Sequence, residues 1–482
     1  MEELDRNAIV VEGIDRVFDR RKVLLVLLLP LSMALMSISS VNVALPTIKT
    51  GLEASSADVQ WVLAGYGLAF GALLTPAGRL GDVMGRGTWF IVGLVLFIVG
   101  SLACGLAPHP AFLNVARLVQ GLGAGVFSPQ VTGMIQQYFH GGGRAKAFGL
   151  FGLVISASVA FAPVLAGGII SAIGDEWGWR WAFLFNLPLG LLAMVLALLW
   201  FPFETERKRK RQPRGSAARL DLDPIGVLLV VGTVLCVMLP WMGEPGLQWV
   251  LLPLGPVLLW LWVRWERRYK ARGGEPMVDL NLFKFPSFRN GIAVAGTMFL
   301  GSASIFAVVA IFLQQGVGRS ALETGLISLP NAIASGAASV LIVRHVMKYG
   351  HLAVVWSLAA MASGVALTGV VALCTVEFDW PWWLIAFPLM LVGVGMGGMG
   401  SSNQTISLRN VPTEHGGTAG GIKQTVERVG AALGNAMVTG LLFGSLRWGW
   451  GVAALVAYGA ILLFCLVALV LSVLDWRQAQ RA

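Results

Sequence analysis

Long apolar runs separated by short polar segments fill most of this sequence of 482 residues. An α-helix needs about 20 predominantly apolar residues to cross a bilayer. Fourteen runs are near or above that length: 23–45, 59–77, 88–107, 112–136, 147–171, 180–201, 224–241, 248–263, 290–313, 323–343, 352–374, 383–407, 417–444 and 449–473. The pattern predicts an all-α integral membrane protein with both ends of the chain on one side.

Two segments rich in Lys and Arg, residues 203–222 and 264–289, bracket the seventh and eighth runs. We therefore expect a six-helix bundle on each side of two inserted transmembrane helices. The predicted parts are an N-terminal segment 1–22, an N-terminal bundle 23–203, basic loops with the inserted helices 204–289, a C-terminal bundle 290–474 and a tail 475–482. The first run is too long for a signal-peptide core, so we expect it to be retained.

The distribution of basic residues predicts the orientation in the membrane. Of the 35 Lys and Arg residues, 28 fall in segments on the side of the N-terminus and four fall in segments on the other side. The remaining three, Arg117, Lys423 and Arg428, lie inside apolar runs. Because cytoplasmic loops carry the excess of Lys and Arg, both termini are expected in the cytoplasm of a cell-membrane protein.

Composition narrows the possible partners. Hydrophobic residues make up 56% of the chain and charged residues only 12%, with a mean hydropathy of +0.75 and a net charge of +10. No polar segment is large enough to form a nucleic-acid-binding domain, so membrane lipids are the expected anionic neighbours. The four cysteines lack C-x-x-C spacing and the five histidines lie near predicted loops. We predict no metal site and no cofactor.

One polar segment stands out between the second and third runs. Residues 78–86 read GRLGDVMGR, in which Gly78, Gly81 and Gly85 alternate with the charged residues Asp82 and Arg86. Glycines permit close backbone approach and positive φ, and the charges can pair at helix ends. The spacing resembles the signature loop of the major facilitator superfamily, where it implies a conformational gate. The alternative is an ordinary charged turn that holds cytoplasmic topology.

The fourth run contains Arg117 and Gln120 in the sequence LNVARLVQGLGAG. A cation inside a bilayer costs at least a few kcal/mol unless a polar cavity or a partner receives it. The pattern resembles the superfamily's fourth-span motif, whose arginine is associated with proton coupling. The alternative is an arginine that reaches outward to the membrane surface. The glycines of this run and of 393–400 resemble nucleotide loops only superficially, and close helix packing explains them better.

The fifth run reads SVAFAPVLAGG and contains Ser158, Ala162, Pro163, Gly167 and Gly168. Small residues at this spacing around a proline predict a kinked helix that packs tightly. The run resembles the superfamily's exporter motif, with Ser158 and Ala162 in place of two glycines. An ordinary tightly packed helix would have the same physical properties, so only the resemblance implies export.

Further segments resemble the fourteen-span drug:proton antiporter branch of this superfamily. They are VNVALPTI at 41–48, QWVLAGY at 60–66 and WRWAFLFNLPLG at 179–190. The branch usually carries an aspartate in the first span, and Ser37 occupies that position here. From the polar residues of the spans we predict a substrate cavity formed by Ser37, Asn42, Arg117, Gln120, Asn403 and Gln404.

Glu427 is the only acid that the pattern places deep in a run. It lies in KQTVERVG, one helical turn after Lys423 and beside Arg428. Ionisable groups inside a membrane are functional by default. We therefore predict that Glu427, with Arg117, Lys423 and Arg428, couples transport to protons. The alternative is a structural ion pair between Lys423 and Glu427.

Together these features predict a major facilitator fold with alternating access. The resemblance implies a monomeric secondary transporter that exports small amphiphilic compounds by proton antiport, as in multidrug efflux and antibiotic resistance. An exporter of a lipid or of an anionic amphiphilic metabolite is the alternative, as is a non-transporting receptor on the same fold. An enzyme would need a cluster of His, Asp or Glu at the membrane surface, and the sequence shows none.

Overall fold

The structure is a computed structural model, and it describes residues 8–9, 18–139, 141–201, 203, 223–242, 246–274, 276, 278–407, 409 and 416–481. Almost all of these residues are helical, and β1 (Ala8–Ile9) pairs with β2 (Phe18–Asp19) in a short antiparallel ladder. The N-terminal helices are α2 (Arg20–Gly51), α3 (Ser56–Met84), α4 (Arg86–Gly105), α5 (Pro110–Tyr138), α6 (Gly141–Ile173), α7 (Asp175–Leu184) and α8 (Asn186–Trp200). Two helices follow, α10 (Pro224–Met238) and α11 (Leu254–Ala271).

The C-terminal helices are α12 (Pro286–Ser302), α13 (Ile305–Ile311), α14 (Ala321–Leu326), α15 (Leu329–Tyr349), α16 (His351–Glu377), α17 (Ala386–Ser407), α18 (Gly416–Ser445) and α19 (Trp450–Arg481). Short 3₁₀ or π segments are η1 (Leu239–Trp241), η2 (Leu247–Leu251), η3 (Leu280–Lys284), η4 (Phe312–Gly316), η5 (Trp382–Ile385) and η7 (Leu446–Trp448).

Twelve helical segments among the described residues are long and apolar enough to cross a membrane. Two of the fourteen runs expected to span, 112–136 and 323–343, are not among them. The first run lies in α5, whose 29 residues include Arg117, Gln120 and Gln130 and are therefore less hydrophobic. The second falls in α14 and α15. The number fourteen stays a prediction.

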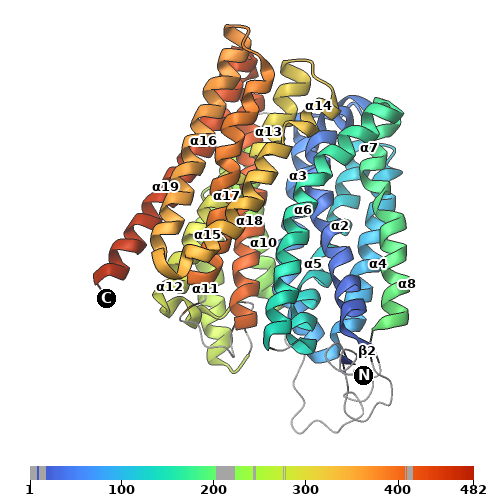
Figure 1. The fold of residues 1–482 in the computed structure, drawn as a ribbon, viewed down its shortest axis with the longest axis vertical. Coiled ribbons are helices and arrows are strands. Elements are labelled where there is room, and N and C mark those ends of the chain that lie inside the picture. The colour runs from blue at the N-terminus through green and yellow to red at the C-terminus, as the bar shows by residue number, and fades with distance from the viewer. Residues whose placement is uncertain are drawn as a thin grey trace.

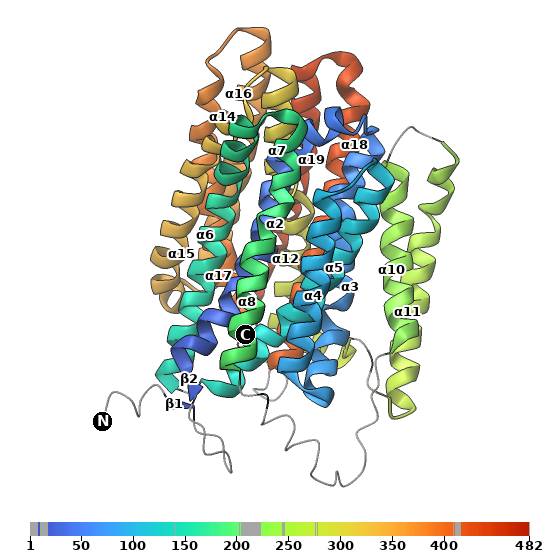
Figure 2. The same cartoon turned by 90° about the vertical axis from the view of Figure 1, so that its right-hand side faces the viewer.

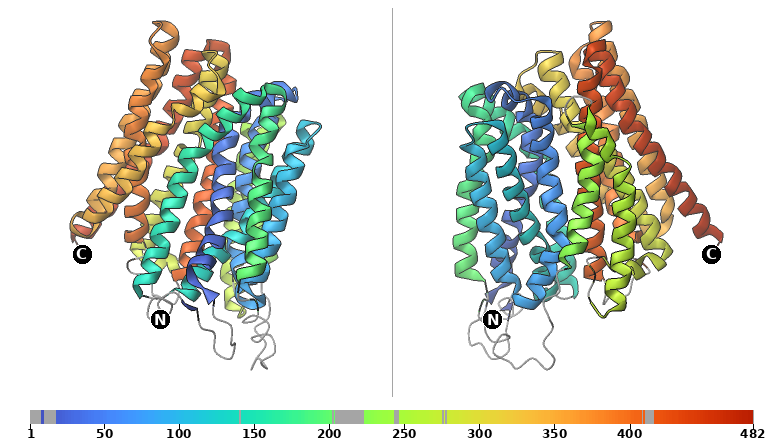
Figure 3. Two further views of the ribbon diagram at one scale, coloured as in Figure 1. Left: turned by 45° about the vertical axis from the view of Figure 1, so that its right-hand side comes forward. Right: turned by 180° about the vertical axis from the view of Figure 1, so that it is seen from behind.

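The helices form two groups that stand side by side (Figure 1). The N-terminal half contains α2 to α8 and the C-terminal half contains α12 to α19. Helices α10 and α11 form a hairpin beside these groups (Figure 2) and lie across the seam between them when the molecule is seen from behind (Figure 3). Val234 and Met238 of α10 pack with Ala64 of α3 and Ala432 of α18 in one apolar cluster. The hairpin thus contacts both halves.

Glycines allow the central helices of each half to pack closely. In α5, Gly121 lies against the backbone of Tyr66 in α3, and Gly123 lies against the backbone of Phe97 in α4. In α17, Gly397 contacts the backbone of α15 and Gly395 contacts α16 in the same alternating way. A Cβ atom at these positions would overlap its neighbour, so the glycine-rich runs are packing surfaces.

Several helices extend beyond the apolar runs that predicted them. Residues 78–84, predicted to be a polar turn, continue α3, and Gly85 with φ of 112° is the single residue between α3 and α4. Helix α11 continues to Ala271, although a loop was predicted from residue 264. Helix α19 continues to Arg481 through most of the predicted tail. Hydropathy marks only the apolar part of each helix, so polar residues that continue a helix were assigned to turns, loops or the tail.

Candidate transport cavity

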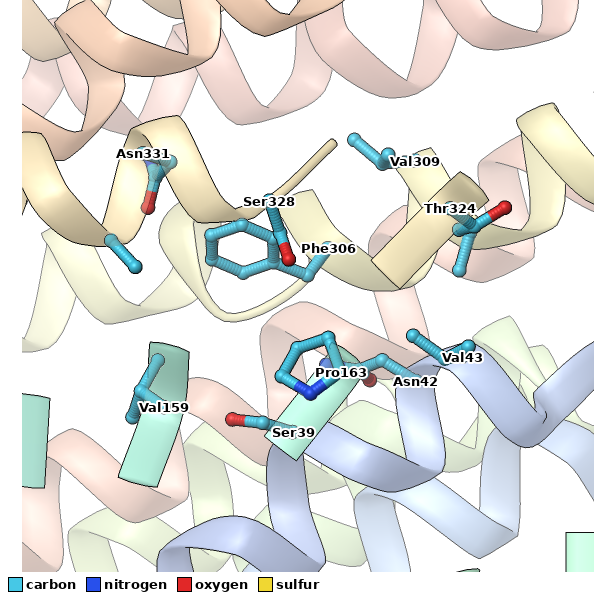
Figure 4. A pocket seen from close by; sticks show the side chains of 12 residues that line it. Ser39, Asn42, Val43, Val159, Pro163, Phe306, Val309, Thr324, Ser328 and Asn331 are labelled. Carbon is cyan, nitrogen blue, oxygen red and sulfur yellow. The ribbon is translucent and has the colours of Figure 1, made fainter. Parts of the chain in front are cut away.

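A cavity lies between the two halves, with about 410 Å³ of space that atoms do not fill, open space at its mouth included. One wall comes from α2 and α6 and the other from α13, α14 and α15 (Figure 4). The lining residues are Ser39, Asn42, Val43, Val159, Pro163, Phe306, Val309, Ala310, Thr324, Ser328, Asn331 and Ala332.

The lining of this cavity is apolar with a few neutral polar groups. Asn331 donates from its amide nitrogen to the carbonyl oxygen of Leu389 at 2.7 Å, which fixes the amide against α17. Ser328 and Thr324 donate to backbone carbonyls of their own helical segment. Asn42 faces them from α2 (Figure 4). None of the lining residues carries a formal charge. The arrangement suits a compound with an apolar body and one or two hydrogen-bonding groups.

Helices α6 and α14 are in backbone contact beside the cavity. Gly167 of α6 lies against the carbonyl group of Ala321, and Gly325 of α14 lies against the carbonyl group of Pro163. A side chain at either glycine would overlap backbone atoms of the other half. The predicted exporter motif therefore lies at the contact between the halves, and its Pro163 also lines the cavity.

The other residues of that motif have ordinary surroundings. Ser158 and Ala162 are buried in α6. A Cβ atom at Gly168 would meet only the side chain of Leu322, at 4.0 Å. The two adjacent glycines of the motif therefore differ, because Gly167 contacts backbone and Gly168 does not. A second link between the halves is close by, where Gln314 donates to the carbonyl oxygen of Val43 at 2.9 Å.

Helices α3 and α18 form a third contact between the halves. The hydroxyl oxygens of Thr75 and Thr425 are 3.3 Å apart. The guanidinium of Arg428 lies over the ring of Phe70, 4.9 Å from its centroid. Gly71 lies against the Cβ atom of Arg428. Arg428 therefore points toward the N-terminal half and contributes to this contact.

The predicted coupling residues Lys423 and Glu427 are neighbours on α18. Lys423 Nζ lies 3.8 Å from Glu427 Oε1 and donates to Gln404 Oε1 of α17 at 2.6 Å. The side chain of Lys423 is 3% exposed and that of Glu427 is 20% exposed. The carboxylate is thus partly accessible, whereas its cationic partner is enclosed.

Arg117 lies inside the N-terminal half and does not line the cavity. Its guanidinium donates to the carbonyl oxygen of Val62 at 2.8 Å, to Gln120 Oε1 at 2.6 Å and to Ser37 Oγ at 3.2 Å. It also lies over the ring of Tyr66, 4.2 Å from the centroid. Neutral acceptors and an aromatic ring therefore hold this buried cation, and Ser37 and Gln120 belong to its network.

The predicted gate residues pack within the N-terminal half. Gly78 lies next to Pro129, Gly81 is covered by the side chain of Gln130, and the Arg86 guanidinium covers Gly133 of α5. Gln130 also donates to the carbonyl oxygen of Ala77 at 2.6 Å. The side chain of Asp82 lies outside the described part of the structure. The α3–α4 junction is thus attached to α5 through glycines on both sides.

The six predicted cavity residues are therefore dispersed. Asn42 lines the cavity, Ser37, Arg117 and Gln120 form the buried network, and Gln404 binds Lys423. Asn403 donates to the carbonyl oxygen of Gly291 and joins α17 to α12. The polar lining residues not predicted from sequence are Ser39, Thr324, Ser328 and Asn331. Each of these four is a polar residue within an apolar run, and that was the only sequence signal for them. The sequence does not show which face of a helix points into the cavity.

Comparisons with known proteins identify a family and several relatives. The Major Facilitator Superfamily model matches residues 25–435. The chain is 32% identical over 414 residues to the "Probable actinorhodin transporter" of Streptomyces coelicolor, covering 84% of this chain and 69% of that protein. It is 32% identical over 415 residues to "Multidrug resistance protein Stp" of Mycobacterium tuberculosis, covering 83% and 72%.

A solved structure gives the same fold. The crystal structure of a bacterial homologue of the human lysosomal transporter Spinster, in an inward-facing and occupied conformation, superposes with a TM-score of 0.61 at 17% identity. The match covers 95% of this chain and 97% of that one. At 17% identity this similarity establishes the fold alone.

Proposed function

The chain belongs to the major facilitator superfamily, and from this premise we propose that it exports small amphiphilic compounds by proton antiport with alternating access. It is a membrane transporter rather than an enzyme. Relatives are named for the transport of actinorhodin and for multidrug resistance. A cargo of that class has a large apolar body and scattered polar groups.

The cavity between the halves is the observation that carries this proposal. Its two walls belong to different halves, so relative movement of the halves changes both its shape and its access. Gly167 and Gly325 let the backbones of α6 and α14 meet directly beside the cavity, and in this proposal that contact closes one end. Such a contact can separate and re-form without rearranging either helix. The resemblance of the α6 segment to the exporter motif supports outward movement of the cargo.

Proton coupling is proposed for Glu427. Protonation of the carboxylate would remove its attraction to Lys423, 3.8 Å away, and leave that ammonium bound to Gln404. The ion pair lies on α18, which also carries the contact with α3. A change of charge on this helix therefore acts on a contact between the halves. Arg117 would support coupling only through the packing of α2, α3 and α5, since it does not line the cavity.

The experiment is transport by inverted vesicles or proteoliposomes under an imposed pH gradient. A panel of matched amphiphiles with different charge and one lipid would be measured with and without the gradient. Uptake into inverted vesicles that collapses with the gradient supports proton antiport. Transport of the lipid alone would favour the lipid exporter, and the absence of gradient dependence for every compound would remove antiport.

Orientation and oligomeric state complete the proposal. Helix α2 begins and α19 ends toward the lower side of the molecule in Figure 1. We place this side in the cytoplasm of a cell-membrane protein because the basic segments lie there. We also propose that a monomer transports, because the cavity is built from one chain. Site-specific labelling from each side and the mass of the detergent complex test these two points.

A further inference from the structure

A second hollow lies outside the cavity, on the surface of the C-terminal half. It runs between residues 323–330 of the α14–α15 segment and residues 382–390 of η5 and α17. Glu323 is followed by lining residues three, four and seven positions later, which is the spacing of a single helix face. We name this hollow the lateral groove. The sequence pattern assigned no function to either of its walls.

The α14–α15 segment separates the lateral groove from the transport cavity. Thr324, Ser328 and Asn331 of this segment point into the cavity (Figure 4). Ile327 and Pro330 of the same segment line the groove instead. The segment therefore has one face for each hollow, and an occupant of the groove packs against a wall of the cavity.

The length of the groove is apolar. Ile327 lines it but is only 6% exposed, so this residue forms the floor. Ala386 also lines it with a short side chain, whereas Leu326, Phe387 and Met390 are exposed and form the rims. Helix α17 belongs to a segment that is long and apolar enough to cross a membrane. A narrow apolar channel along such a helix fits an acyl chain of the surrounding bilayer.

Two opposite charges lie at one end of the groove. The guanidinium of Arg319 lies over the ring of Trp382, 5.3 Å from its centroid, and Trp382 lines the groove. Glu323 lines it from the other wall. In the capping box of α14, Glu323 Oε2 accepts from the backbone N–H and the hydroxyl of Ser320 at 2.8 and 2.9 Å, so this box leaves Oε1 to other donors. Tryptophan is enriched at the level of lipid headgroups, which places this charged end there.

We propose that the lateral groove binds one phospholipid with a zwitterionic headgroup, such as phosphatidylethanolamine. Arg319 binds the phosphate, Glu323 attracts the ammonium group, and one acyl chain lies along α17. A phospholipid with net negative charge fits less well, because Glu323 repels it and gains no partner. Helix α14 lies at the end of the molecule opposite the termini (Figures 1 and 2). With the termini in the cytoplasm, as proposed above, the lipid belongs to the outer leaflet.

A lipid in the groove supports a contact between the halves. Gly325, between the residues that line the groove, lies against the carbonyl group of Pro163 in α6. The lipid packs on this segment from outside and stabilises the position from which Gly325 reaches Pro163. This consequence for the transport cycle rests on the proposed function, whereas the binding of the lipid does not.

Native mass spectrometry of the intact protein, titrated with phosphatidylethanolamine in detergent, tests the groove. The wild type should retain one lipid more tightly than all others. Ala386→Trp fills the groove with a side chain and should lose this lipid. Ile333→Trp is the matched control, because it adds the same side chain to an exposed position of α15 that does not line the groove, and it should keep the lipid. If Ala386→Trp fails to fold, Met390→Trp fills the same groove.

Two further variants test the headgroup. Arg319→Gln should weaken the binding of phosphatidylethanolamine and of phosphatidylglycerol alike, by at least about threefold for an exposed charge pair. Glu323→Gln keeps the capping box, since glutamine serves equally at that position. It should remove the preference for phosphatidylethanolamine over phosphatidylglycerol. Glycerophosphoethanolamine, which is the headgroup without chains, should not compete.

Four outcomes would overturn the proposal. Equal retention of lipid by the wild type and Ala386→Trp would show that the groove does not hold it. Competition by glycerophosphoethanolamine would leave a site for the charges alone. One-for-one displacement by a transported compound would make the groove a cargo site, and a wild-type dimer that Ala386→Trp dissociates would assign it to a second copy of the chain. These measurements use no gradient and no transport, so they remain decisive if antiport is wrong.

Discussion

The ammonium group of Lys423 lies 3.8 Å from Glu427 Oε1 but only 2.6 Å from Gln404 Oε1, so its stronger contact is with a neutral amide of another helix. The ion pair can therefore be lost without leaving the lysine unbound. A carboxylate that gains and loses a proton during a transport cycle needs such a partner. When Glu427 is neutral, Lys423 keeps its hydrogen bond to Gln404 and is not left as an unpaired buried charge.

Glu427→Gln should abolish transport driven by a pH gradient while the protein stays folded. The amide keeps the size of the side chain but cannot carry a proton, so gradient-driven uptake into inverted vesicles should fall to the level without a gradient. Exchange of labelled for unlabelled cargo without a gradient should continue. Thermal unfolding in detergent serves as the control for folding. Undiminished gradient-driven export would remove Glu427 from the mechanism.

Gly167→Ala should weaken the closed end of the cavity, whereas Gly168→Ala should not. A Cβ atom at Gly167 overlaps the backbone of α14, but at Gly168 it meets only a leucine side chain at 4.0 Å. Overpacking of this kind typically costs about 1–3 kcal/mol. The populations of the two access states should therefore shift in the first variant alone. Labelling of a cysteine introduced into the cavity wall, at Ser328, from each side of the membrane measures this shift, and equal behaviour of the two alanine variants would contradict it.

The sequence predicts the features of this fold that depend on local patterns. Apolar runs located the membrane helices, and small residues around Pro163 identified α6 as a tightly packed helix. Both signals are carried by neighbouring residues, because hydropathy and side-chain volume act within a few turns. Glu266 was misplaced for the same reason. The charged residues that follow residue 263 resemble a loop, and only the packing of α11 against α10 and the following loop shows that the helix continues.

The cavity lining could not be predicted, because it depends on how each helix is rotated and on which half it faces. Asn331 lies almost 300 residues after Asn42 in the chain, and only the assembled halves bring them to opposite walls. Arg117 was expected in the cavity lining but lies elsewhere. Its pattern indicated a functional cation, but the helix rotation directs it toward α2 and α3 rather than into the cavity.

Asp82→Asn should slow transport with little change in the affinity for cargo. The α3–α4 junction is attached to α5 through Gly81 and Gly133 and is remote from the cavity lining. A change of charge there should affect the rate of conversion between access states rather than the binding surface. Equilibrium binding and initial transport rates should be measured on the same preparation. A large loss of binding with normal turnover would show that the segment contributes to the cargo site.

The last prediction concerns the charge of the cargo, which should be neutral or anionic. The described cavity lining has no charged residue. The charged residues that the sequence pattern places inside the spans are Arg117, Lys423 and Arg428 against Glu427, which leaves an excess of positive charge. In a medium of low dielectric constant this excess repels a cation by several kcal/mol, and salt screens it poorly. Ser37 contributes to the excess, because its hydroxyl accepts from Arg117 at 3.2 Å without neutralising it.

Competition by matched cationic, neutral and anionic amphiphiles against one transported compound measures this preference. In the wild type, the neutral and anionic members should compete best. Ser37→Asp places a carboxylate beside Arg117 and should shift the ranking toward cations, by about tenfold for each 1.4 kcal/mol of repulsion removed. Ser37→Ala is the matched control, since it changes no charge and should keep the wild-type order. A preference for permanent cations that persists in Ser37→Ala would show that the electrostatic excess does not reach the cavity.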